Sequence, residues 1–198
     1  MVADSPRIGS HTASEIYSAV GMALSWWESS EDMLLGLFKS LNDSNPDRVK
    51  SYIKATRNVR SQMLDKDLIS GSNFFNPGEV RKLQHALDSL KDMVTRRNQI
   101  SHGHCSNLNF SENGIAVMSG HFLVPAYNEL GPSDRTDEMR FALSADDINE
   151  FIRVLRIHRG VVMDAYHAIM MRAQDARLRA EGREPIYSHN GGRFWEPF

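Results

Sequence analysis

The sequence lacks several features that define common protein classes, and each absence excludes something. Cys105 is the only cysteine among 198 residues, so the chain forms neither an internal disulfide nor a multi-cysteine zinc site. No apolar run approaches the ~20 residues of a membrane-spanning helix. The first fifteen residues lack the basic-then-apolar pattern of a secretory signal. We therefore expect a cytoplasmic protein with no membrane segment.

An excess of charge of one sign is also missing. The 23 Lys and Arg residues are balanced by 25 Asp and Glu residues, which gives a net charge of −2 and a pI of 6.4. A protein that coats nucleic acid by bulk charge needs a positive excess, so nucleic-acid chemistry here requires a small basic site. The sequence contains no glycine-rich phosphate loop, no G-x-S-x-G elbow and no H-E-x-x-H motif. We expect no cofactor.

Apolar residues recur at helical spacing in four segments of the chain. The predicted helices run from about Ala13 to Leu41, from Pro46 to about Ile69, from Pro77 to about His102, and from Ala145 to about Ala180. The last three begin at capping signals, namely Asn45-Pro46, Asn76-Pro77, and Ser144 with Asp147 three residues on. Four long helices joined by short turns are typical of an antiparallel bundle.

The periodicity changes between the third and fourth helices. Short β-prone runs flank Asn113-Gly114, a dipeptide that favours a tight hairpin turn. We expect the hairpin to pair Leu108 and Phe110 with Ile115 and Val117, and the run MRFAL (139–143) to add a short strand.

These patterns predict an all-α fold, an up-and-down four-helix bundle with a small β-hairpin insertion between the third and fourth helices. The helical domain spans 13–181 and its hairpin and loop insertion spans 106–143. We expect residues 1–12 to be a disordered N-terminus and 182–198 to be a C-terminal tail.

Arg97 interrupts the apolar face of the third helix. The stripe of Val80, Leu83, Leu87, Leu90 and Val94 continues at position 97 with an arginine. A guanidinium facing a core needs a carboxylate, a phosphate or an interface. His102 follows five residues later, and Gly103 allows the helix to end there, so that the imidazole can turn toward the arginine. Arginine binds phosphate oxygens and histidine moves protons near neutral pH, which suits phosphodiester chemistry.

The segment from Arg97 to His102 resembles the R-x(4–6)-H signature of HEPN domains (higher eukaryotes and prokaryotes nucleotide-binding). Asn98, directly after the arginine, and Gly103 are also similar to that family. The resemblance implies a helical bundle with the motif near the end of the third main helix. It further implies a metal-independent endoribonuclease, in a toxin or defence role, whose dimer brings two motifs into one cleft.

The resemblance also implies roles for individual residues. Arg97 binds the scissile phosphate, and His102 assists attack by the ribose 2′-OH. Asn98 supports the site, and an acidic residue such as Glu31 orients it. Two other segments fit the loose spacing, Arg153…His158 and Arg183…His189, but the first lies in the middle of a helix and the second in the tail.

Other interpretations of the same residues stay open. Some HEPN-like proteins keep the fold without nuclease chemistry, so the chain is alternatively a binding or regulatory module that dimerises or binds a protein partner. Arg97 then forms a structural ion pair with Glu28 or Glu31, or with the acidic start of the fourth helix, while His102 caps its own helix. A zinc site is the least favoured option, because adjacent ligands rarely point together. Its ligands are His102, His104, Cys105 and His121.

Overall fold

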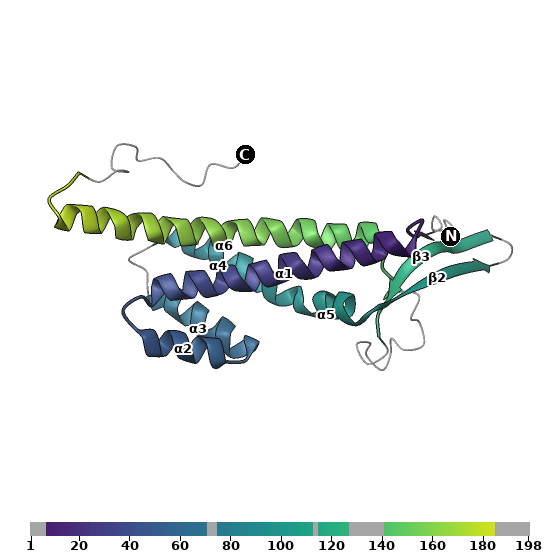
Figure 1. Ribbon diagram of the computed structural model, residues 1–198, viewed down its shortest axis with the longest axis horizontal. Helices are drawn as coiled ribbons and strands as arrows, with labels where there is room; N and C mark the ends of the chain where they lie inside the picture. The colour runs from purple at the N-terminus through teal and green to yellow at the C-terminus, as the bar shows by residue number, and fades with distance from the viewer. Residues whose placement is uncertain (1–6, 71–74, 113–114, 127–140, 185–198) are drawn as a thin grey trace. The chain divides into compact units, whose positions relative to one another are not determined.

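The computed structural model describes residues 7–70, 75–112, 115–126 and 141–184 (Figure 1). It is mostly helical, as the hydrophobic periodicity predicts, and it also contains a small three-stranded sheet. The helices are α1 (Ala13–Leu41), α2 (Pro46–Lys54), α3 (Arg57–Ser70), α4 (Pro77–Asp92), α5 (Val94–His102) and α6 (Ala145–Ala180). The strands are β1 (Arg7–Ile8), β2 (His104–Glu112) and β3 (Ile115–Val124).

Side-chain caps start the helices where the sequence places them. The Asn45 side chain accepts a hydrogen bond from the backbone N–H of Arg48 at the start of α2. At the start of α4, the Asn76 side chain accepts from Gly78 and Glu79. At the start of α6, the Asp147 N–H donates to the Ser144 hydroxyl and the Ser144 N–H donates to the Asp147 carboxylate. These contacts satisfy N–H groups that have no partner inside the helix.

Two of the four predicted helices are interrupted, which corrects the sequence prediction. The second divides into α2 and α3 at Ala55, whose backbone is extended (φ −73°, ψ 154°). Arg60 stabilises this end of α2, because its guanidinium donates to the carbonyls of Tyr52 and Ile53. The third divides into α4 and α5 at Met93. Neither break contains glycine or proline, so the periodicity did not reveal it.

The contacts of the chain divide it into two compact units. The first unit contains the described residues up to Ser29 together with Asp92–Arg156, and the second contains Ser30–Lys91 and the chain from Ile157 onward. Each unit has its own buried side chains. The first includes Ile16, Trp27, Ile100, Phe122, Ile148 and Leu155, and the second includes Leu37, Phe38, Leu64, Leu68, Leu83 and Ile169. Both α1 and α6 therefore contribute a part to each unit.

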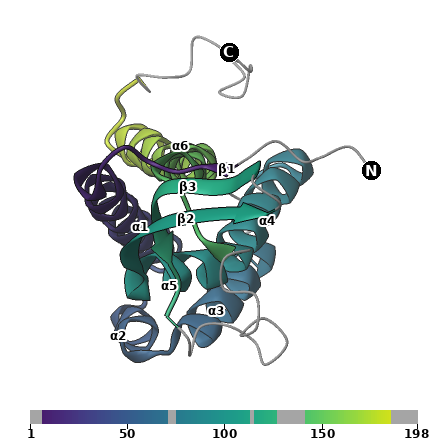
Figure 2. The same ribbon diagram turned by 90° about the vertical axis from the view of Figure 1, so that its right-hand side faces the viewer.

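The sheet belongs to the first unit, and β3 lies between β1 and β2 (Figure 2). The expected antiparallel hairpin is present, but the predicted pairing is wrong: Leu108 lies opposite Gly120, and Phe110 opposite Met118. The register follows from the two-residue connection, which sets Glu112 against Ile115 and leads to a bulge after Phe110. Of the run 139–143, Leu143 forms only an isolated bridge with Leu123, and 139–140 lie outside the described residues.

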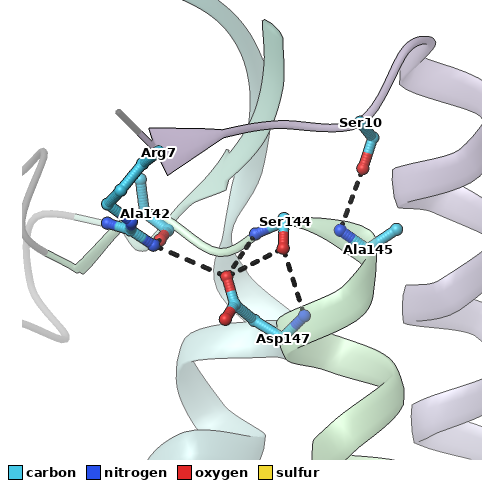
Figure 3. A network of polar contacts seen from close by, with 6 residues as sticks. All are labelled: Arg7, Ser10, Ala142, Ser144, Ala145 and Asp147. Atoms are coloured by element: carbon cyan, nitrogen blue, oxygen red, sulfur yellow. Dashed lines mark hydrogen bonds and ion pairs between the residues drawn. The ribbon is translucent and has the colours of Figure 1, made fainter. Parts of the chain in front are cut away.

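The N-terminal segment is ordered from Arg7 onward, which corrects the expectation of a disordered stretch over 1–12. Arg7–Ile8 pairs in parallel with β3. Figure 3 shows how the segment is tied to the start of α6: the Arg7 guanidinium donates to the Ala142 carbonyl (2.7 Å), and the Ser10 hydroxyl accepts from the Ala145 N–H (2.9 Å). Backbone pairing of this kind leaves no hydrophobic pattern, and residues 1–6 lie outside the described residues.

Candidate functional site

The residues of the R-x(4)-H motif lie in the last two turns of α5, and their side chains differ in exposure to solvent. Ile100 and Gln99 are buried and fix the helix in the first unit. Arg97 and Asn98 are partly buried, and the ring of His102 is exposed. The helix thus presents a half-covered cation and, at its end, an imidazole in contact with water.

Arg97 is held by several long contacts. Its Nη2 lies 3.6 Å from a carboxylate oxygen of Glu28. Its Nη1 donates to the Asn98 side-chain oxygen and to the Ser101 hydroxyl, each at 3.4 Å. Its Nε is buried and has no hydrogen-bond partner among the described residues. Charge-assisted hydrogen bonds are normally about 2.7–2.9 Å, so the guanidinium is positioned without being saturated.

Glu28 is the carboxylate that pairs with Arg97, one of the two that the sequence offers on the first helix. The Glu28 side chain is 67% exposed and that of Arg97 is 27% exposed. An ion pair this open to water contributes about 0–1 kcal/mol to stability. A phosphate oxygen can therefore replace the carboxylate at little cost, whereas a sealed ion pair would resist the exchange.

Glu31, the acidic residue that the sequence favoured for this site, has other partners. Its carboxylate lies 3.1 Å from Nη2 of Arg57 and 3.9 Å from Nη1 of Arg60, both on α3 in the second unit. Arg60 also lies over the ring of Tyr52, at 5.8 Å. The sequence pattern did not reveal this cluster, because it predicts one continuous helix in place of α2 and α3, and in such a helix Tyr52 and Arg60 cannot approach each other.

Tyr52 is buried in the same cluster, and its ring stacks on Phe38 with ring centroids 4.0 Å apart. Burial raises the pKa of Tyr52 from 10.0 to about 12, and the negative charge of Glu31 adds to the rise. Arg60 and Arg57 oppose it only in part. The phenol therefore stays protonated well above the pH at which an exposed tyrosine ionises.

We expect one tyrosine of the folded protein to ionise late, near pH 12. Because the folded pKa lies above the unfolded one, the stabilising contribution of Tyr52 is complete below pH 10 and is lost between pH 10 and 12. Titration of tyrosinate absorbance in the wild type and in Tyr52→Phe measures this. The variant should lack the latest step. If the step missing from the Tyr52→Phe titration curve lies near the ordinary pKa of tyrosine, the late ionisation does not belong to Tyr52.

Close packing, more than backbone freedom, explains why glycine stands at position 103, directly after α5. Its backbone is extended (φ −73°, ψ 158°) and leads directly into β2. A Cβ atom at this position would lie 2.7 Å from Cγ of Leu123 and 2.9 Å from the carbonyl oxygen of Gln99. The close packing of β3 against the helix end therefore requires glycine. This packing fixes the position of His102 relative to the sheet.

The histidines and cysteine near the helix end are distributed along the hairpin. Cys105 lies opposite Leu123, while His121 lies opposite Asn107. His104 and Cys105 are adjacent in a strand, so their side chains point to opposite faces. No group of three or more His, Cys, Asp or Glu residues within the described ranges can hold a metal ion. Burial raises the pKa of the Cys105 thiol, which favours its neutral form.

The competing motif on α6 is engaged in unrelated contacts. Arg153 forms an exposed ion pair with Glu150, one turn away on the same helix (2.6 Å). His158 lies edge-on to His85 at 6.1 Å, and burial together with His85 lowers the pKa of His158. His189, of the third matching segment, lies outside the described residues.

A groove of about 430 Å³ runs beside the start of α5, and the sequence analysis missed it. Its apolar residues are Met93, Leu143, Phe151 and Val154, and its polar residues are Asp92, Arg96, Asp147 and Glu150. The volume is in the range of small-molecule sites. The lining residues are too distant in sequence for a pattern to reveal.

The chain matches no protein-family model, no curated protein and no solved structure among those searched. Over the described ranges, no helix is both long and apolar enough to span a membrane.

Proposed function

We propose that this protein is a HEPN-like, metal-independent endoribonuclease that acts as a cytoplasmic dimer in a toxin or defence role. The observation that carries the proposal is the end of α5. There, a partly exposed Arg97 with unsaturated donors is followed, five residues later, by an exposed His102. A cation that binds phosphate and a group that transfers protons near neutral pH are the minimal set for cleaving RNA without metal.

The proposed fold is the up-and-down bundle of that family. In this scheme α1 and α6 are the first and fourth main helices. The pair α2 and α3 takes the place of the second helix, and α4 with α5 takes that of the third. The hydrogen bond from the Arg97 N–H to the Met93 carbonyl (2.9 Å) is the first of α5, and Met93 is the one residue between α4 and α5. So short an interruption supports placing the motif near the end of a third main helix.

In the proposed reaction, Arg97 binds the scissile phosphate and stabilises the charge that develops on it. His102 acts as general base and accepts the proton of the ribose 2′-OH. The 2′-oxygen then attacks phosphorus and the bond from phosphorus to the 5′-oxygen breaks. The leaving 5′-oxygen takes a proton from water, and the protonated His102 returns its proton to solvent, which yields a 2′,3′-cyclic phosphate and a 5′-hydroxyl. Asn98 supports the guanidinium through its side-chain contact. We assign the orienting role to Glu28 in place of Glu31, because Glu28 contacts Arg97.

The rival function is a HEPN-like binding or regulatory module in which Arg97 is structural. The Arg97–Glu28 ion pair is the observation that favours it. The two functions differ in one property: a structural arginine can be replaced with loss of stability or binding, whereas a catalytic one is required for chemistry on an added RNA.

RNA cleavage in the presence of EDTA tests the proposal. We expect the purified wild type to cut single-stranded RNA and to leave cyclic phosphate ends, since no step uses a metal. Arg97→Ala should abolish the cut, whereas Arg153→Ala, a surface arginine in the alternative motif, should not. Cleavage that requires added Mg²⁺, or equal cleavage by Arg97→Ala and wild type, would overturn the mechanism. A wild type that cuts no RNA but binds a protein partner would favour the rival.

A further inference from the structure

The outer side of β2, the side away from β3, is an edge of the sheet. In the order β1-β3-β2, β2 is an edge strand, and no described strand pairs with its outer side (Figure 2). The strand is nine residues long. Natural edge strands of this length are usually protected against pairing by lysine, proline or an inward-pointing charge. The sequence of β2, HCSNLNFSE, contains no lysine, arginine or proline, and its one acidic residue comes last.

The backbone of β3 shows which groups of β2 point to this outer side. Ser119, His121 and Leu123 bond to the N-terminal segment and to Leu143, away from β2. In an antiparallel ladder, bonded and non-bonded pairs alternate. Backbone hydrogen bonds between the two strands therefore join the even-numbered residues of β3 to the β2 residues opposite them. On β2 the odd-numbered residues, including Cys105, Asn107 and Asn109, direct their N–H and C=O groups outward.

The strand is complementary to itself in one antiparallel register. With Leu108 on a two-fold axis, Asn107 lies opposite Asn109 of a second copy, and Ser106 opposite Phe110. In this register each odd-numbered residue of one copy lies opposite an odd-numbered residue of the other. Because the N–H and C=O groups of these residues point outward, roughly eight backbone hydrogen bonds form between the two strands. It also covers Phe110, which is exposed in the single chain.

We propose that β2 pairs antiparallel with β2 of a second copy of this chain, so that two three-stranded sheets join into one. The outward backbone groups, the uncharged centre of the strand and the coverage of Phe110 all favour this occupant. The inference does not depend on the nuclease proposal. Positions 104 of the two copies lie eight residues apart in this register, roughly 27 Å along the strands. The two Arg97 motifs therefore lie at opposite ends, and this contact is distinct from the shared-cleft dimer that the HEPN resemblance implies.

A proline at position 107 tests the inference, because it removes an N–H that points to the outer side and that β3 does not use. Proline is tolerated at such edge positions. The matched control is Asn107→Thr, which loses the same side-chain contact with Asn109 but keeps the N–H. We expect Asn107→Pro to have half the solution mass of wild type and Asn107→Thr, measured by light scattering at equal concentration. Circular dichroism checks that all three are folded.

A charge exchange tests the register independently of proline. Variants with lysine, or with glutamate, at both 107 and 109 place like charges opposite each other between copies. Each should have half the wild-type mass, and mixing the two should restore it. Hydrogen exchange supplies a third readout, with protected amides at Asn107 and Asn109 in the wild type. An unchanged mass in Asn107→Pro, or fast exchange at both amides in the wild type, overturns this inference and leaves the nuclease proposal standing. A monomeric wild type overturns this inference and also the proposed dimeric nuclease.

Discussion

Replacing His102 by alanine is expected to slow RNA cleavage by roughly 10²–10⁴-fold, the usual contribution of a positioned acid–base group. The ring is exposed at the end of α5, so its loss should leave the stability of the protein almost unchanged. The measurement is single-turnover cleavage of a labelled RNA, with thermal unfolding of the same samples. A fall in rate without a fall in unfolding temperature identifies a chemical role.

His104→Ala is the matched control, since it removes another exposed imidazole two residues away. It should cleave at the wild-type rate. The double variant Arg97→Ala/His102→Ala should be no slower than the slower single variant, because residues that act in one step are not additive. Arg97→Lys keeps the charge but loses the forked geometry and should restore only part of the rate. A His102→Ala variant within twofold of wild type removes the histidine from the mechanism.

Replacing Asp67 by alanine is expected to lower the free energy of unfolding by about 2–3 kcal/mol. The carboxylate binds the Arg48 guanidinium through both oxygens and accepts from the Asn42 side chain at 2.7 Å. The side chain of Asp67 is 11% exposed and that of Arg48 is 31% exposed. Breaking a fully buried ion pair costs about 3–5 kcal/mol. We expect less here because Arg48 can be rehydrated.

Urea unfolding measures this loss, and Asp47→Ala is the control. Asp47 is an exposed carboxylate paired with Lys50 on the same helix, and its removal should cost less than about 0.5 kcal/mol. The cycle of Arg48→Met, Asp67→Leu and the double variant separates the pair from its surroundings. The double variant should be more stable than the sum of the single losses predicts. Additive losses would show that the two charges do not stabilise each other.

The bounds of the longest helices could be predicted from the sequence because several turns of periodicity and clear end signals agree. The predicted helices from Ala13 to Leu41 and from Ala145 to Ala180 have those bounds in the structure. The breaks at Ala55 and Met93 could not be predicted. The first depends on Arg60 reaching two backbone carbonyls, a tertiary contact, and the second has no side-chain cap.

The sequence predicted some residues of the candidate site and not others. The interrupted stripe identified Arg97, because a cation among apolar positions needs a partner. The choice between Glu28 and Glu31 could not be made, since the two lie three residues apart on one helix and differ only in what surrounds them. Arg57 and Arg60, which engage Glu31, belong to a helix whose start the periodicity did not reveal. The groove at Arg96 depends on residues that only the fold brings together.

The shared use of α1 and α6 by both units has a consequence for the order in which the chain folds during synthesis. The second unit begins inside α1, at Ser30, and the first resumes only at Asp92. Neither unit has all its parts until α6 has emerged from the ribosome. Trp27 of α1, which stacks on Phe151 of α6, must therefore wait for its partner while more than a hundred residues are added. Such a chain cannot mature one unit after another. It depends on late synthesis, and a translational pause before α6 would expose it longest to aggregation or to chaperones.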